Sequence, residues 1–171
     1  NHLSNYLKVT SLNKLKKIKN FECLIYDCPA NMKDKKVKDI ISKCNYLVIP
    51  IQASIFDQTA TNLFLDLINK LSRIRKGKTD LVFVINKYKN RAQIFKKLDV
   101  FLLSKKIKPL CKFSDRMAYQ LLAEEGKSIF DVNHKSIYDL KNEWVNLLEF
   151  LRVKWLKKLV YAKQALFSKY K

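Results

Sequence analysis

Apolar runs separated by polar stretches divide the chain into regular segments. Three of these runs are FECLIYD at residues 21–27, YLVIP at 46–50 and LVFVI at 81–85. Nearly continuous apolar runs of this length are typical of parallel strands that are covered on both faces. They therefore predict three buried strands, and a fourth, shorter strand is expected over residues 108–112.

Between the predicted strands, apolar residues recur at helical spacing. This spacing predicts helices over residues 11–19, 35–43, 57–75 and 91–105. The longest of them should face the core with one apolar stripe. The predicted stripe consists of Leu63, Leu67, Ile68 and Leu71.

Alternation of strands and helices predicts the fold class. Repeated strand, helix, strand units imply right-handed crossovers, so we expect an α/β fold: a parallel sheet flanked by helices in a Rossmann-like, three-layer arrangement. Gly77 marks a turn, and Ser114 and Gly126 are expected to cap and end a short helix. Since no repeat or low-complexity tract divides the chain, residues 1–171 should form a single domain.

The last segment combines a helical stripe of apolar residues with many basic ones. We expect residues 136–171 to form one long basic amphipathic helix whose first part packs on the sheet. The part past Leu151 has two interpretations. It is either a terminal core helix whose lysines complement its own carboxyl-end dipole, or a basic, aromatic-bearing helix that faces DNA, a membrane surface or a second subunit.

Asp27 ends the first apolar run, where the carboxyl end of a parallel strand is expected. Ligands bind at that edge of open α/β sheets. An acid there commonly holds a metal ion, often through water, beside a bound phosphate. The alternative is a simple strand-ending turn, which Asp followed by Cys-Pro also suits.

Composition limits the class of protein. A chain of 171 residues with 48% hydrophobic residues is long enough for one domain with a core. No stretch approaches the roughly 18 to 20 uninterrupted apolar residues of a membrane span. The cysteines have no metal-site spacing, so we expect them to be small core residues of a reduced, cytosolic protein. They are Cys23, Cys28, Cys44 and Cys111.

Net charge adds a candidate partner. The chain has 35 Lys and Arg against 15 Asp and Glu, a formal charge of +20. Such a surface attracts polyanions such as nucleic acid or an anionic membrane, although lysines can also form a generic solvated face. From the placement of charge, the candidates for phosphate contacts with DNA are Arg116, Arg152, Lys154, Lys157 and Lys158.

Four segments in order resemble a known family. They are LIYDCPA, CNYLVIPIQASIFDQTAT, LVFVINK and DRMAYQLLAEEGKSIFDV. Together they resemble the ParA/MinD superfamily of deviant Walker P-loop ATPases after the phosphate loop, and most of all the ParA plasmid and chromosome partition proteins. The resemblance covers residues 21–132 and implies a P-loop NTPase-like fold.

This resemblance implies roles for individual residues. Asp27 is similar to the Walker B aspartate, which orients a water on the magnesium of bound ATP. Asn86, followed by Lys87, is similar to the residue that reads the adenine edge, a task that suits an amide with both a donor and an acceptor. Pro50, with Gln52, matches the segment that shapes the neighbouring strand end. Arg116 opens a signature at the nucleotide edge and dimer surface that continues with Tyr119, Gly126 and Phe130.

The chain departs from the family in its phosphate-binding parts. These ATPases need a glycine-rich loop with two lysines, and Gly77 and Gly126 are the only glycines here, so no such loop can be assembled. The family's catalytic aspartate on the following strand is also absent. We therefore expect a fragment that is incomplete at its N-terminus, with an unpaired apolar gap in the sheet. The alternatives are a decayed or split gene, or strands that close up differently.

For the intact protein, the resemblance implies an ATP-dependent partition ATPase of the cytoplasm and nucleoid. ATP and Mg²⁺ would be its cofactors. Its partners would be a second copy in the ATP state, non-specifically bound DNA and a centromere-binding partition protein. This chain alone is expected not to hydrolyse ATP. Two alternatives are a non-catalytic ParA-like remnant that binds DNA or a partner, and a MinD-like regulator anchored to a membrane by the C-terminal helix.

Overall fold

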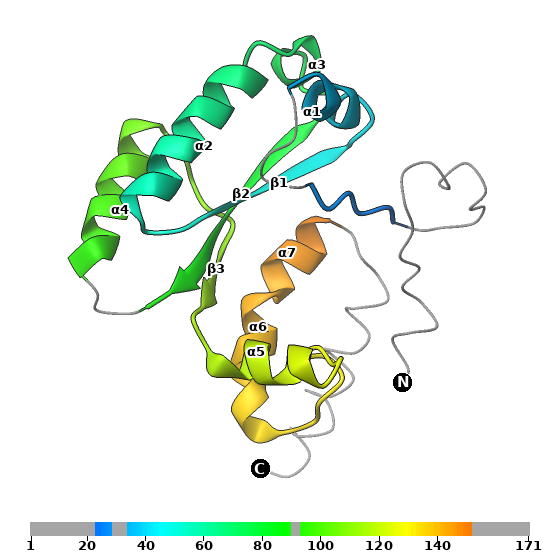
Figure 1. The fold of residues 1–171 in the computed structure, drawn as a ribbon, viewed down its shortest axis with the longest axis vertical. Helices are drawn as coiled ribbons and strands as arrows, with labels where there is room; N and C mark the ends of the chain where they lie inside the picture. Colours follow the sequence, from blue (N-terminus) through cyan, green and yellow to red (C-terminus); the bar gives the residue numbers. More distant parts are fainter. Residues whose placement is uncertain (1–22, 29–33, 90–92, 152–171) are drawn as a thin grey trace.

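A three-stranded parallel sheet forms the centre of the molecule (Figure 1). The computed structural model describes residues 23–28, 34–89 and 93–151. Within them the strands are β1 (Tyr46–Ile51), β2 (Asp80–Tyr88) and β3 (Cys111–Ser114), in the order β1-β2-β3. Both pairings are parallel, which confirms the predicted α/β class with a parallel sheet.

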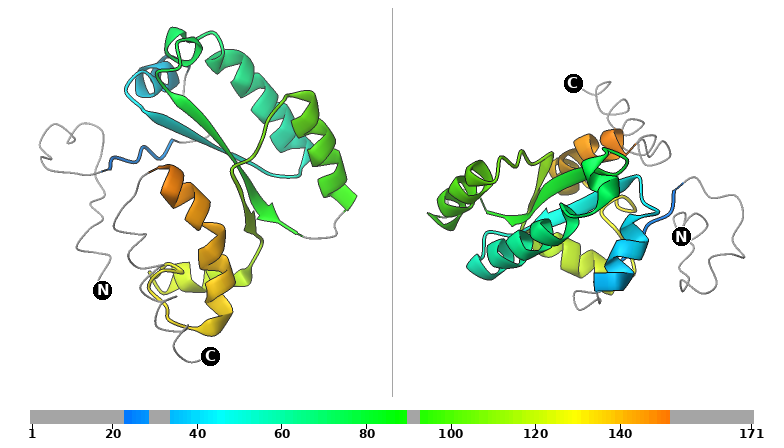
Figure 2. Two further views of the ribbon diagram at one scale, coloured as in Figure 1. Left: turned by 180° about the vertical axis from the view of Figure 1, so that it is seen from behind. Right: turned by 90° about the horizontal axis from the view of Figure 1, so that it is seen from above.

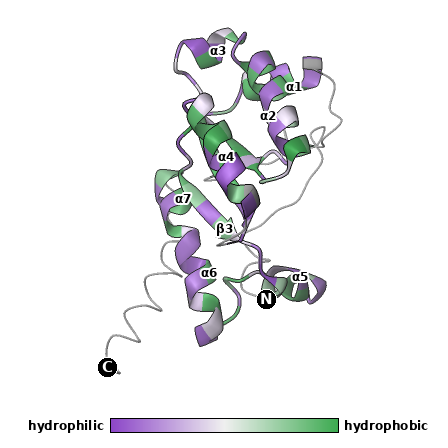
Figure 3. Ribbon diagram, turned by 90° about the vertical axis from the view of Figure 1, so that its left-hand side faces the viewer, coloured by the Kyte–Doolittle hydropathy of each residue, from purple (hydrophilic) through white to green (hydrophobic). Residues whose placement is uncertain are grey.

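Helices connect and follow these strands. They are α1 (Asp34–Ile41), α2 (Ile55–Ile68), α3 (Ser72–Arg75), α4 (Gln93–Ser104), α5 (Met117–Glu124), α6 (Tyr138–Glu143) and α7 (Val145–Phe150), with a 3₁₀ turn over Lys135–Ile137. Figure 3 shows hydrophobic and hydrophilic residues interleaved along α4 and α6, as expected for helices that cover a core with one face.

One face of the sheet packs against α1, α2 and α4. Alternate residues of β1 and β2 point to this side, and they contact the buried sides of the three helices. The fully or nearly buried members of this main core are Ile41, Ile49, Ile51, Ala53, Leu65, Ile68, Ile85, Phe95, Leu98 and Leu102. The predicted helix at 35–43 and strand at 46–50 are therefore confirmed.

The opposite face of the sheet is covered by the C-terminal helices. Val82 and Val84 of β2, Cys111 and Phe113 of β3 and Leu147 of α7 form a second cluster there. Helices therefore lie on both faces of the strands, as the views in Figures 1 and 2 show together. A third cluster joins α6 and α7 to residues 129–130.

The expected helix over residues 57–75 is divided. α2 ends at Ile68, and Leu71 adopts an extended conformation (φ −77°, ψ 128°) before α3 begins. Leu63 was expected in the core and is 68% exposed. The buried residues of α2 are instead Thr61, Leu65 and Ile68, and on a helix Leu63 points roughly 200° away from Leu65.

The strand expected over residues 108–112 also begins and ends later than predicted. β3 covers Cys111–Ser114 rather than residues 108–112, because residues 105–107 complete the end of α4 and Pro109 has no N–H to donate. Ser114 belongs to this strand and does not cap α5. Arg116 is the N-cap residue and makes no side-chain capping bond. Gly126 ends α5 as predicted, with φ +66°.

The C-terminal segment is described up to Leu151. Instead of one continuous helix, residues 135–151 form the 3₁₀ turn, α6 and α7, with Trp144 between the two helices. Trp144 packs against Phe113 and Phe130, with ring centroids 4.3 and 6.1 Å apart. Residues 152–171 lie outside the described residues. No helix in the described part is long and apolar enough to cross a membrane.

The expected strand at residues 21–27 is not formed over its described part. Residues 23–28 make no strand pairing, and Ile25 is 76% exposed. A parallel strand needs a neighbour to bond with, and within the described residues β1 pairs only with β2. The outer edge of β1 is thus unpaired within the described residues, and the missing strand expected from the family resemblance stays a prediction.

Candidate functional site at the carboxyl edge of the sheet

The three strands end at one edge of the sheet and place polar residues there. The register pairs Ile51 with Ile85, so Gln52 and Asn86 leave adjacent strands at the same level. Tyr88 pairs with Ser114, which brings the end of β3 to the same edge. Polar groups from the three strands therefore converge where ligands bind in open α/β sheets.

Asn86 and Lys87 form a strained bulge at the end of β2. The pairing with β3 shifts register between Ile85 and Tyr88, and Lys87 has φ +52°. The Lys87 N–H donates to Asn86 Oδ1 at 3.0 Å, which holds this conformation. A lysine in the left-handed region is uncommon, and such residues concentrate at functional sites.

The end of β1 leads into the amino end of α2. Pro50 lies in β1 opposite Val84 and is exposed. Ser54 caps α2: its Oγ accepts from the Asp57 N–H at 3.0 Å and donates to Asp57 Oδ2 at 2.6 Å. The cap Ser54 lies two residues after Gln52, so the positive dipole end of the helix lies at the same edge of the sheet.

The end of β3 is tied to two neighbouring segments. Glu143 of α6 accepts hydrogen bonds from the N–H of Ser114, at 2.7 Å, and from its hydroxyl. Asp115 forms an ion pair with Lys89 at 3.0 Å, and its N–H donates to Tyr88 O at 2.9 Å. These bonds fix the backbone that carries Arg116.

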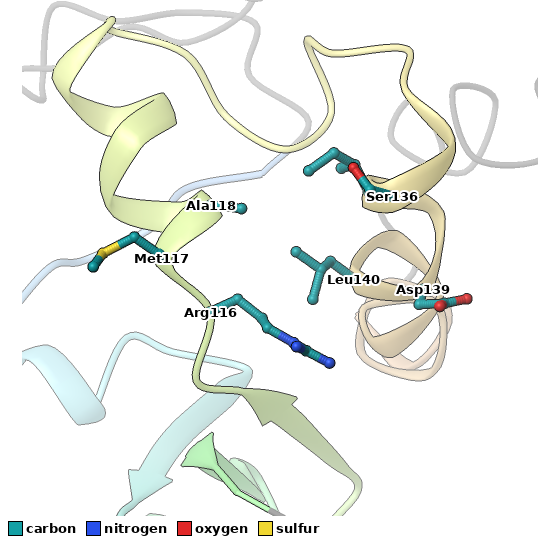
Figure 4. A pocket seen from close by; sticks show the side chains of 7 residues that line it. Arg116, Met117, Ala118, Ser136, Asp139 and Leu140 are labelled. Carbon is teal, nitrogen blue, oxygen red and sulfur yellow. The ribbon is translucent and has the colours of Figure 1, made fainter.

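Arg116 is exposed and lines an open hollow of about 400 Å³ between α5 and α6 (Figure 4). Its side chain extends beside Leu140, whereas Asp139 points away from it. The other lining residues are Met117, Ala118, Ser136 and Ile137. The lining of this hollow thus combines the Arg116 guanidinium with apolar side chains, the Ser136 hydroxyl and the acidic Asp139.

Two groups beneath this region have shifted pKa values. Burial, and to a lesser extent the charge of Glu143, raises the pKa of the Cys111 thiol to about 11. Burial also raises the pKa of Tyr119, partly offset by the Trp144 N–H that donates to its hydroxyl at 3.1 Å. Both groups are therefore protonated at neutral pH and act as packing and hydrogen-bonding groups.

The sequence-predicted residues separate into three sets. The structure brings Pro50, Asn86, Lys87 and Arg116 to one edge of the sheet. Asp27 is exposed and lies in the unpaired segment 23–28, so it does not end a strand, and its role at a magnesium ion stays a prediction. Within the described residues no group of three or more His, Cys, Asp or Glu could hold a metal. The DNA candidates outside the described residues are Arg152, Lys154, Lys157 and Lys158.

Sequence reasoning missed two features of this site. The left-handed conformation of Lys87 has no signal in the sequence, because a glycine or Asn is the usual residue there. Glu143 lies far along the chain from Ser114, so only the tertiary structure brings them into contact. Comparison with known proteins assigns the chain to no family, because no family model and no curated protein matches it.

Proposed function

We propose that these residues are the part of a ParA-like partition ATPase that follows its phosphate loop. The supporting observation is the strained Asn86–Lys87 bulge at the carboxyl edge, level with Gln52 and beside the end of β3. An amide held there by its backbone can present a donor and an acceptor to the edge of an adenine ring. ATP-dependent dimerisation and non-specific DNA binding would be the activities of the complete ATPase.

The glycines favour a non-catalytic chain. Gly77 and Gly126 both adopt positive φ at the ends of helices, +60° and +66°. Neither is available for a loop that cradles phosphates, and the sequence holds no other glycine. The phosphate loop, and with it hydrolysis, would have to come from polypeptide other than these 171 residues. A ParA-like remnant that binds DNA or a partner without catalysis is the second candidate.

An NMR titration of the chain with Mg-ATP and with adenosine tests the proposed site. We expect weak, saturable shifts that concentrate on the Asn86 side-chain amide and the Lys87 and Arg116 N–H groups. They should be similar for both ligands because the base provides the contacts. ATP hydrolysis should not exceed that of buffer.

Matched variants locate the binding. Asn86→Ala should abolish the shifts, and Asn146→Ala, at an exposed position of α7, should leave them unchanged. Shifts that survive Asn86→Ala, or that cluster away from the carboxyl edge, would contradict the proposed site. ATP binding much tighter than adenosine binding would mean that the chain builds a phosphate site of its own.

A further inference from the structure

The bulge at the end of β2 contains one more residue than the strand opposite it. Before the bulge, Ile85 pairs with Lys112. After it, Tyr88 pairs with Ser114, so two residues of β2 lie opposite one residue of β3. A bulge of this kind persists only while the pairs on both of its sides are kept. The pairing of Tyr88 with β3 is therefore needed for Lys87 to keep its φ of +52°.

Beyond the bulge, β2 is bound to the residue that follows β3. The Asp115 N–H donates to Tyr88 O at 2.9 Å, and the Asp115 side chain pairs with Lys89 at 3.0 Å. The two side chains of this ion pair are 37% and 66% exposed, and exposed ion pairs contribute little to stability. The tyrosine ring packs on Phe95 with centroids 4.7 Å apart, which fixes the side chain. The direction of the Tyr88 carbonyl therefore depends mainly on the backbone bond from Asp115.

The end of β3 is in turn fixed by Glu143 of α6. Among the described residues β3 pairs only with β2, so its alternate N–H groups point away from the sheet. The Ser114 N–H is one of these groups, and it donates to Glu143 Oε2 at 2.7 Å. The Ser114 hydroxyl donates to the other carboxylate oxygen. Both oxygens of Glu143 thus bind the last residue of β3, at the place that a further strand would otherwise occupy.

The position of Glu143 is itself well defined. The next residue, Trp144, packs on Phe113 with ring centroids 4.3 Å apart, and its Nε1–H donates to the Tyr119 hydroxyl at 3.1 Å. Two consecutive residues at the end of α6 therefore contact two consecutive residues of β3. Hydrogen bonds to an ionised carboxylate are also stronger than bonds between neutral groups.

We propose that Glu143 is a positioning residue for the side-chain amide of Asn86. Glu143 fixes the end of β3, and β3 fixes the far side of the bulge. Lys87 thereby keeps its positive φ, and its N–H keeps the bond to Asn86 Oδ1 at 3.0 Å. The inference rests on the proposed function, in which this amide contacts the edge of an adenine ring.

An NMR titration of the full chain with adenosine measures the effect on binding. Glu143→Ala should raise the Kd at least about fivefold, since it frees the end of β3. Glu143→Gln should have a smaller effect, because its amide oxygen can still accept from the Ser114 N–H. The control Asp139→Ala removes the same charge from the same helix and should leave the Kd unchanged, since Asp139 is exposed and points away from Arg116 (Figure 4). Thermal unfolding verifies that each variant is folded.

A measurement without ligand tests the bulge itself. Positive φ brings the amide and α protons of a residue close together, so Lys87 should give a strong NOE between them in the original chain. This NOE should weaken in Glu143→Ala. Glycine adopts positive φ without strain, so Lys87→Gly should make the bulge independent of Glu143. In that background Glu143→Ala should raise the adenosine Kd less than about twofold, which a purely structural role of Glu143 would not produce.

Two outcomes would overturn the proposal. An unchanged Lys87 NOE in Glu143→Ala would show that the bulge persists without this carboxylate. An equal rise of the Kd with and without Lys87→Gly would show that Glu143 does not act through the bulge. If the original chain does not bind adenosine, the proposed function fails, and the NOE of the ligand-free chain still decides whether Glu143 fixes the bulge.

Discussion

Among the described residues, two lysines occupy the left-handed backbone region, and they differ in what holds them there. Lys87 lies in the bulge at the carboxyl edge of the sheet, where the Asn86 side chain supports it. Lys106 ends α4, where the helix-ending hydrogen bonds support it. Because a residue with a Cβ is strained in this region, each position indicates a backbone that its surroundings impose.

Lys106→Gly should stabilise the protein by about 1 kcal/mol, since glycine adopts positive φ without the steric penalty. Urea unfolding of the variant and the original chain measures the change. Lys105→Gly is the matched control because it removes the same charge at a residue that does not have positive φ, and it should lower the free energy of unfolding by about 0.5–1 kcal/mol. Destabilisation by both substitutions would contradict the strain assigned to Lys106.

Because of Cys111, the free energy of unfolding should fall at alkaline pH. Its folded pKa of about 11 lies above the ordinary thiol value of 9.0, so the folded state holds the proton more tightly. That stabilisation is complete below pH 9 and is lost as the pH rises toward 11, by about 2–3 kcal/mol. Cys111→Ala should reduce this pH-dependent loss, measured by urea unfolding at several pH values, whereas Cys23→Ala should not. An unchanged pH profile in Cys111→Ala would contradict this assignment.

α2 shows how a helix can have several apolar residues and bury only some of them. Thr61, Leu65 and Ile68 face the sheet, and Phe56 and Leu63 are exposed. Since both kinds of position are apolar in the sequence, spacing alone gives two possible stripes. The structure selects the stripe that contacts the sheet residues of β1 and β2.

Substitutions at two leucines of α2 should have very different costs. Leu65→Ala should lower the free energy of unfolding by about 2–4 kcal/mol, because it leaves a cavity in the main core. Leu63→Ala should change it by less than about 0.5 kcal/mol, since that side chain is 68% exposed. Urea unfolding measures both. Equal costs would mean that Leu63 is buried against a further segment or a partner.

The whole molecule has an open side along β1. Within the described residues this strand bonds only to β2, its sequence YLVIPI carries no charge, and Val48 is 37% exposed. Only Pro50 reduces the number of free backbone donors at this edge. An uncharged edge strand of a parallel sheet is suited to pairing with another strand.

Hydrogen exchange tests whether this edge is open in solution. The amides of β2, which has a strand on each side, should exchange slowly. Along β1, every second amide should exchange orders of magnitude faster, because only alternate amides of an edge strand bond to the neighbour. Uniform slow exchange along β1 would show that a further strand pairs with it.

Local pattern determined much of this fold. The strands at residues 46–50 and 81–85, the helix at 35–43 and the helix end at Gly126 follow from apolar runs, helical spacing and turn chemistry, which act between residues close in the chain. The resemblance to ParA-like ATPases, and not this local pattern, singled out Pro50, Asn86, Lys87 and Arg116, and parallel pairing brings them to one edge of the sheet.

Contacts between distant segments determined the rest. An apolar run such as residues 21–27 becomes a strand only if a neighbour supplies backbone partners, and its described part has none. The break after α2, the bulge at Lys87 and the bonds from Ser114 to Glu143 likewise depend on packing against other elements. A sequence pattern records which residues can be buried or paired, and the tertiary contacts select which of them are, because burial and strand pairing need two partners.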